Sequence, residues 1–121
     1  MQTMAILESF WHDRRRWYAA NLPNRGIVSN LPKDAVLEVP ALATAEGMVA
    51  PPLGELPAGI TAVLLRRLAA VEATVEAALT GNRKLFVEAL ILDGGVSDYD
   101  TAAKLAEALL KAHAPHLPQF S

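Results

Sequence analysis

Apolar and polar positions follow one another in patterns that change several times along the chain. Between residues 4 and 20, apolar side chains recur near helical spacing. They predict a helix that ends before Pro23, because the residue before a proline is disfavoured in the α region. Six of the eight prolines lie within 21–57, where apolar runs at 26–28 and 35–39 predict short strands. Prolines would confine such strands to edges or to short pieces.

The second half of the chain has the periodicity of helices. From 58 to 80, apolar residues recur every three or four positions and form one apolar stripe. Gly81 follows as a left-handed residue that ends this helix, and Asn82 can cap the next one. Ser97 and Asp100 have the spacing of a capping box at the start of a last helix. We therefore predict a helix-dominated α+β fold, with short strands in 24–55 and helices near 4–20, 58–80, 83–93 and 98–113.

The composition is that of one small globular domain, with 121 residues, 52% apolar residues and a formal charge of −2. Cysteine is absent, which excludes disulfides, thiolate nucleophiles and zinc knuckles built from this chain. Uncharged stretches reach about half of the roughly 20 residues that a membrane span needs. The first residues lack the basic and apolar regions of a secretory signal. We expect a cytoplasmic domain with neither a membrane nor a nucleic acid as its partner.

Three glutamates are candidates for acid–base chemistry. Glu72 and Glu76 are four residues apart on one predicted helix, but arginines and other polar residues share that side, which favours a solvated face. Glu38 lies in an apolar run, where a carboxylate that points inward needs a partner. For Glu38 a structural ion pair is favoured over a catalytic role.

Histidines and arginines form two further patterns. His113 and His116 are three residues apart, and His12 would be the third ligand of a metal ion. A proline separates the pair, however, and the helix dipole already accounts for a histidine at a helix C-terminus. Arginines 14–16 lie among aromatic residues, as in surfaces that bind nucleic acid. Consecutive arginines do not share a helix face and the aromatic spacing fits a core, so neither kind of site is expected.

The segment 21–32 reads Asn-Leu-Pro-Asn-Arg-Gly-Ile-Val-Ser-Asn-Leu-Pro, and 34–40 reads Asp-Ala-Val-Leu-Glu-Val-Pro. Together they resemble the Asn-x-Gly-x-Ile-x-Asn-Leu-Pro and Val-Glu-Val-Pro stretch of the NAD-dependent family 4 glycoside hydrolases, which include α-galactosidases, α-glucosidases, α-glucuronidases and 6-phosphoglycosidases. The similarity continues through 54–57, 76–83 and 88–93, and 113–120 is similar to the terminal His-x-x-x-Leu-Pro-x-Phe of that family. Asp93-Gly94 departs from the family's usual Asp-Pro, which leaves this turn less rigid.

The resemblance implies a C-terminal α+β domain, similar to that of lactate and malate dehydrogenases, whose N-terminal Rossmann domain is not part of this chain. In this family NAD takes a hydride from C3 of the sugar, the C2 proton is then lost, the glycosidic oxygen leaves, water adds and the hydride returns. A divalent metal ion, usually Mn²⁺, polarises the C3 oxygen. Its cysteine and histidine ligands lie upstream in the family. We therefore expect neither NAD nor Mn²⁺ to bind to this chain alone, and no activity from it alone.

For contacts with a substrate or cofactor we select Asn24, Arg25, Gly26 and Asn30, and we assign no catalytic residue and no metal ligand. Glycine lets the backbone approach a ligand, and amides form hydrogen bonds with sugar or ribose hydroxyls. Asparagines equally satisfy the backbone of turns. For Arg25 a solvated position is the more ordinary role.

Two functions remain open. In the first, the domain completes the substrate cleft of a glycosidase and supplies oligomer contacts, so that its partners are the Rossmann domain and a sugar. In the second, it is a stand-alone dimerisation module derived from the same fold. The high apolar fraction indicates a surface that a partner covers. We expect a homodimer or a higher oligomer in either case.

Overall fold

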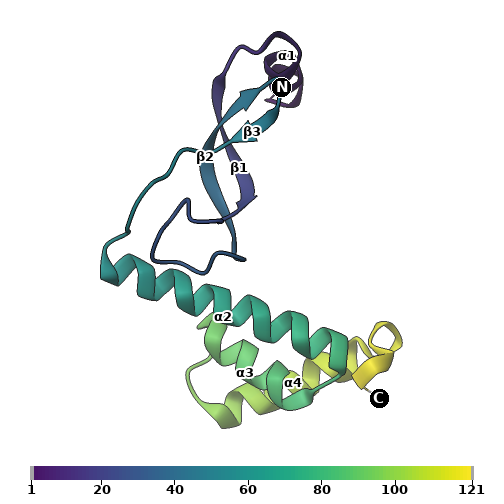
Figure 1. The fold of residues 1–121 in the computed structure, drawn as a ribbon. Coiled ribbons are helices and arrows are strands. Elements are labelled where there is room, and N and C mark those ends of the chain that lie inside the picture. Colours follow the sequence, from purple (N-terminus) through teal and green to yellow (C-terminus); the bar gives the residue numbers. More distant parts are fainter. Residues whose placement is uncertain (1, 121) are drawn as a thin grey trace. The chain divides into compact units, whose positions relative to one another are not determined.

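The computed structural model describes residues 2–120, which form two compact units that divide between Thr61 and Ala62. The first unit holds a helix, a three-stranded sheet and a long loop, and the second holds a bundle of helices (Figure 1). One long helix begins in the last residues of the first unit and continues through the second. The predicted α+β fold, dominated by helices, is confirmed.

The first helix, α1 (Gln2–His12), is shorter than the predicted helix over 4–20. The prediction is wrong beyond His12, because Asp13 and Arg15 adopt φ of 46° and 52°, which end a right-handed helix. Ser9 fixes α1 to the sheet: its buried hydroxyl donates to the carbonyl of Ala43 at 2.8 Å. The same hydroxyl accepts the N–H of Arg16, the first residue of the next strand.

The sheet has the order β1-β2-β3, and all its neighbouring strands are antiparallel. The strands are β1 (Arg16–Pro23), β2 (Val36–Thr44) and β3 (Gly47–Val49). Strand β1 replaces the second half of the predicted first helix. It pairs with β2 over its whole length, and its burial alternates from residue 18 onward with the period of a strand. Pairing with a strand that lies far along the chain therefore overrides the local helical spacing.

Strands β2 and β3 confirm the predicted strands within 24–55, and they meet in a hairpin at Ala45 and Glu46. Pro40 lies inside β2, opposite Ala19, but β3 pairs with β2 only at 42–44. At Pro40 the sheet is therefore two strands wide, which satisfies the rule that proline occupies strand edges. The run at 26–28 is not a strand; its Val28 forms a single parallel bridge with Gly54.

The second unit is built on α2 (Ala58–Thr80), α3 (Arg83–Asp93) and α4 (Tyr99–Ala112). The first two agree with the predicted ranges, and α4 differs by one residue at each end. Gly81 has φ of 71°, as predicted for the residue after α2. Asn82 caps α3 by accepting the backbone N–H groups of Lys84 and Leu85. The predicted capping box is wrong, since Asp98 and not Ser97 caps α4, by accepting the N–H of Thr101 at 2.8 Å.

Small side chains on α2 face the core of the second unit. Its buried residues are Ala70 and Ala77, while Val71 and Val75 of the predicted stripe are exposed. Ala77 packs with Leu110 and Phe120 in one buried cluster. A second cluster joins α3 to α4 through the buried residues Val87, Ala102 and Ala106. Alanines let the helices approach closely, whereas the larger side chains of α2 remain on its surface.

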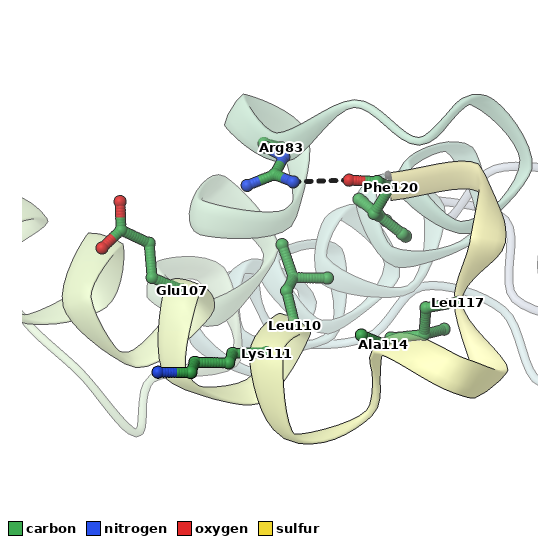
Figure 2. A pocket seen from close by; sticks show the side chains of 7 residues that line it. All are labelled: Arg83, Glu107, Leu110, Lys111, Ala114, Leu117 and Phe120. Carbon is green, nitrogen blue, oxygen red and sulfur yellow. Dashed lines mark hydrogen bonds between the residues drawn. The ribbon is translucent and has the colours of Figure 1, made fainter.

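After α4 the chain turns back along the second unit in two short 3₁₀ turns, Ala114–His116 and Pro118–Phe120. The ring of Phe120 lies 5.9 Å from that of Phe86, in a tilted arrangement. Figure 2 shows the hydrogen bond from the Arg83 guanidinium to the carbonyl oxygen of Phe120. The side-chain amide of Gln119 donates to the carbonyl of Ala78 at the end of α2. The C-terminal turn is therefore fixed to the helices by both apolar and polar contacts.

Candidate functional site

The loop that follows β1 is organised around the side chain of Asn24, which is 0% exposed. Its amide nitrogen donates to three carbonyl oxygens, those of Val28, Leu31 and Pro32, at 2.9–3.0 Å. Its amide oxygen accepts the N–H of Val28 at 2.7 Å. Because one buried side chain satisfies four backbone groups, the loop closes on itself without regular secondary structure.

Asn30 fixes the other end of this loop. Its amide nitrogen donates to the carbonyl of Leu56 and to the Thr61 hydroxyl, and its amide oxygen accepts the N–H of Leu56. Backbone bonds add to these contacts, from Ser29 N–H to the Gly54 carbonyl and from Leu53 N–H to the Ile27 carbonyl. The proline-rich segment before α2 is thereby held against the loop.

Arg25 and Gly26 form the exposed tip between these fixed ends. Arg25 has φ of 44° and Gly26 has φ of 96°, so two successive residues adopt left-handed conformations. A Cβ built on Gly26 would meet no atom within 4 Å, so the space beside this backbone is open. Arg25 and Gly26 are held in place by the hydrogen bonds of Asn24 and Asn30 on either side. They present a cation and an accessible backbone to the surroundings.

The four selected residues thus have two different geometries. Asn24 and Asn30 direct their polar atoms at backbone groups of the same loop, whereas Arg25 and Gly26 face outward. The ordinary role of asparagine in turns is present at both positions. Direct contact with a ligand is therefore open chiefly to the tip, and the asparagines position it.

The carboxylates weighed from the sequence lie on the surface. Glu38 is exposed on β2, opposite Asn21 in the register. The favoured ion pair of Glu38 is wrong, since the ion pairs among residues 2–120 join Glu8 to Arg14, Asp13 to Arg15 and Asp93 to Arg67. Strand alternation turns Glu38 away from the buried Val39. Glu72 and Glu76 are exposed on α2, as predicted for a solvated face.

The arginine cluster lies in the link between α1 and β1. Arg14 pairs with Glu8 at 2.6 Å, and Arg15 pairs with Asp13 at 3.0 Å. The N–H of Ala45 and the Arg15 guanidinium donate to Asp13 and lower the pKa of its carboxyl. These acids reduce the cationic character of the cluster. The predicted core position of the aromatic residues is wrong for Trp11 and Trp17, which are 86% and 57% exposed.

The histidines divide between the two units. His12 ends α1, whereas His113 and His116 follow α4. Over residues 2–120, no three His, Asp or Glu side chains are grouped so that they could hold a metal ion. None of the helices described is long and apolar enough to cross a membrane.

A hollow in the second unit was not among the sites predicted from the sequence (Figure 2). It has a volume of about 320 Å³ and an apolar floor of Leu110, Leu117 and Phe120. Arg83, Lys111 and Glu107 stand at its rim. The only signal in the sequence was the match of Arg83 and 113–120 to family motifs. The Arg83 guanidinium is bound to the Phe120 carbonyl, so this hollow is foremost part of the C-terminal anchoring.

Comparison with protein families gives a match over residues 1–96 to the family 4 glycosyl hydrolase C-terminal domain. An α-glucosidase of Erwinia rhapontici is 30% identical over 99 residues, which are 82% of this chain and 22% of the relative. A probable 6-phospho-β-glucosidase of Bacillus subtilis is 25% identical over 95% of this chain and 26% of its own length. The chain therefore spans about a quarter of the length of these relatives.

Solved structures show the same fold. A 6-phospho-α-glucosidase from gut microorganisms, in complex with NAD and glucose-6-phosphate, superposes with a TM-score of 0.86 at 25% identity, over 97% of this chain and 26% of that protein. A 6-phospho-β-glucosidase of Thermotoga maritima, with manganese, NAD⁺ and glucose-6-phosphate, gives a TM-score of 0.84 at 23% identity. It covers 95% of this chain and 28% of that protein.

Proposed function

Because this chain belongs to the family 4 glycosyl hydrolase C-terminal domains, we propose that it is the C-terminal part of a glycosidase that cleaves O-glycosidic bonds by NAD-dependent oxidation, elimination and addition with a divalent metal ion. The family match over residues 1–96 is the observation that carries this proposal. Structures of similar enzymes in complex with NAD, Mn²⁺ and sugar phosphate support it. We place the complete enzyme in the cytoplasm.

The donor set of this chain does not fit the manganese ion. The sequence has no cysteine, and residues 2–120 contain no grouping of His, Asp and Glu able to bind a metal. We therefore assign no metal or redox step to these residues. The Rossmann domain of the complete enzyme would supply those groups, so this chain alone is expected to be inactive.

The contribution of this domain is one wall of the substrate cleft, formed by the tip of the 24–30 loop. Arg25 offers a cation, and the open backbone at Gly26 offers N–H and C=O groups to sugar or ribose hydroxyls. Asn24 and Asn30 keep that backbone in place through their bonds to the loop. Preorganised polar groups of this kind orient a substrate without further loss of entropy on binding.

A chimera tests this role. Residues 1–121 replace the matching C-terminal quarter of the Bacillus subtilis relative, and hydrolysis of a p-nitrophenyl 6-phosphoglucoside is measured with NAD and Mn²⁺. Gly26→Ala in the chimera should reduce kcat/KM about tenfold or more, because a Cβ is strained at this φ and blocks the open backbone. Gly47→Ala is the matched control, since Gly47 also has a positive φ and open space beside it. Equal losses from both variants would contradict a ligand contact at the tip.

A second function is favoured by the large apolar side chains that remain exposed on helices of both units. Met4, Leu7 and Trp11 are exposed on α1, and Val71 and Val75 are exposed on α2. They suit an interaction module that dimerises without chemistry. An inactive chimera together with a stable dimer of the 121-residue chain would favour the module. Hydrolysis of the glycoside by the purified chain alone, with NAD, Mn²⁺ and a reductant, would contradict both functions as stated.

A further inference from the structure

Helix α2 carries an apolar row with the spacing of a coiled coil. Leu64, Leu68, Val71, Val75 and Ala78 follow one another at steps of four, three, four and three residues, which is the a/d repeat. We call these five residues the α2 seam. Val71 is 56% exposed and Val75 is 50% exposed, so the middle of the seam is uncovered in this chain.

The seam adjoins the side of α2 that packs in the second unit, and Val71 and Val75 line a groove together with residues of α3. That side is formed by the buried residues Ala70 and Ala77, which are seven residues apart and lie about 100° around the helix from Val71 and Ala78. Helix α2 therefore has two apolar sides, one of small residues that is buried and one of larger residues that is not. Large apolar side chains at regular spacing on a surface mark an interaction site.

We propose that the α2 seam binds the α2 seam of a second copy of this chain, with the two helices parallel and in register. The flanking residues argue for this partner. In a parallel pair, a residue on one flank meets the partner's residue five positions further on. Applied to α2, this rule brings Arg67 to the partner's Glu72, and Thr74 to the partner's Leu79.

The first of these contacts joins groups of opposite charge. The N–H groups of Arg67 Nη1 donate to the carbonyl and the carboxylate of Asp93, and the guanidinium has further N–H donors for a second carboxylate. The Glu72 carboxylate has no ion-pair partner among residues 2–120. The third flanking pair, Ile60 with the partner's Leu65, is apolar. In an antiparallel pair, each flank of the seam would face the same flank of the partner. Arg67 and Glu72 lie on different flanks, so neither would meet an opposite charge.

A groove that Val71 and Val75 help to line is where we place the partner's Leu79, the most exposed large apolar residue of α2. Thr74, Phe86, Ala89 and Leu90 are among the residues that line a groove of about 390 Å³ between α2 and α3. Leu79 is 79% exposed on its own chain. In the parallel arrangement the partner's Leu79 meets Thr74, at the edge of this groove. The symmetry of the pair gives both copies the same contact.

This inference specifies the oligomer contacts of the proposed function and rests on it in that respect. A helix pair of about five turns buries less than the roughly 1,200 Å² of a standard-size interface. The dimer of the 121-residue chain is therefore expected to form at micromolar concentrations rather than below. Its test reads out association alone, so that a failed chimera and a failed α2 contact are separate results.

Disulfide formation between introduced cysteines tests the parallel arrangement of the two helices. The chain contains no cysteine of its own, so no other disulfide can form. Val71→Cys and Ala78→Cys are made singly and oxidised with diamide at 50 μM protein. A disulfide needs Cα atoms within about 7 Å, and in a parallel pair each position meets its own copy, so both variants should form covalent dimers. Ala69→Cys is the matched control for Ala78→Cys, since both alanines are exposed on α2 and point to opposite sides. Capture at Val71 without capture at Ala78, or equal capture at Ala69, overturns the proposal.

Charge reversal provides a second measurement on uncrosslinked protein. Glu72→Arg places an arginine opposite the partner's Arg67, and the symmetry of the pair repeats this contact. The Kd of the dimer should therefore rise by roughly tenfold or more. Glu76→Arg makes the same change away from the seam and should leave the Kd unchanged. Arg67→Glu added to Glu72→Arg should restore association. Light scattering that gives a monomer for the parent chain at 100 μM, or equal effects of the two single reversals, overturns the proposal.

Discussion

Gly81 lies directly against the backbone of Gln119, so that a side chain at position 81 has no room. A Cβ built on Gly81 would collide with the carbonyl oxygen of Gln119 and stand 2.7 Å from its carbonyl carbon. Gly81 also has φ of 71°. The link between α2 and α3 is therefore in close contact with the C-terminal turn. Phe120 of that turn packs on Ala77.

Gly81→Ala should lower the free energy of unfolding by about 2 kcal/mol or more, because the left-handed conformation and the collision both oppose a Cβ. Gly59→Ala is the control. Gly59 lies in the first turn of α2, and a Cβ built there would meet no atom within 4 Å. This substitution should make the protein slightly more stable. Urea unfolding followed by circular dichroism measures both. Equal stability of the two variants would refute the close contact of Gly81 with Gln119.

Asn24→Ala should destabilise the first unit by about 3 kcal/mol, because it leaves several buried backbone groups without hydrogen-bond partners. Hydrogen exchange of the Val28 amide should accelerate, since its acceptor is the Asn24 side chain. Asn21→Ala removes the same kind of side chain from an exposed position on β1 and should change stability by less than about 0.5 kcal/mol. Unchanged exchange at Val28 would contradict the assigned role of Asn24.

Gly94→Ala should lower the free energy of unfolding by about 1–2 kcal/mol, and Gly95→Ala should lower it little. Gly94 ends α3 with φ of 92°, and a Cβ there would stand 2.9 Å from the Arg66 guanidinium. That guanidinium donates to the carbonyls of Ile91 and Leu92. Thermal unfolding compares the two variants. A proline at 94, as in the family's usual Asp-Pro, could not adopt this φ, so this chain ends α3 in another way.

The cap of α4 should make stability depend on pH. The backbone N–H of Thr101 donates to Asp98 and lowers the pKa of this carboxyl below its ordinary value of 3.8. A lowered pKa in the folded state means that the contribution of Asp98 is present above pH 3.8 and is lost as the pH falls through the folded pKa.

Asp98→Ala should therefore lower Tm at pH 6 and reduce the fall of Tm between pH 4 and pH 2. Ser97→Ala tests the capping residue that the sequence had suggested and should leave Tm and its pH profile near those of the parent chain. A larger effect from Ser97→Ala than from Asp98→Ala would show that the cap had been assigned to the wrong residue.

The helices of the second unit could be predicted because their signals are local. Gly81 and Asn82 mark a helix end and a helix start through the conformations and hydrogen bonds that these residues favour by themselves. The candidate loop was likewise identified from its residues, but its internal geometry was not. Which asparagine is buried depends on backbone carbonyls that only the folded loop brings together.

The sequence by itself determined the family, the ranges of α2 and α3 and the position of the loop at 24–30, because these depend on motifs, periodicity and residue type. The tertiary structure alone decided that Trp17 and Tyr18 belong to a strand, since their partners Leu42 and Ala41 lie more than 20 residues away. It also decided which side of α2 is buried. Periodicity shows that a helix has an apolar side, but only the packing of Ala70 and Ala77 shows that the small residues are buried while Val71 and Val75 remain exposed.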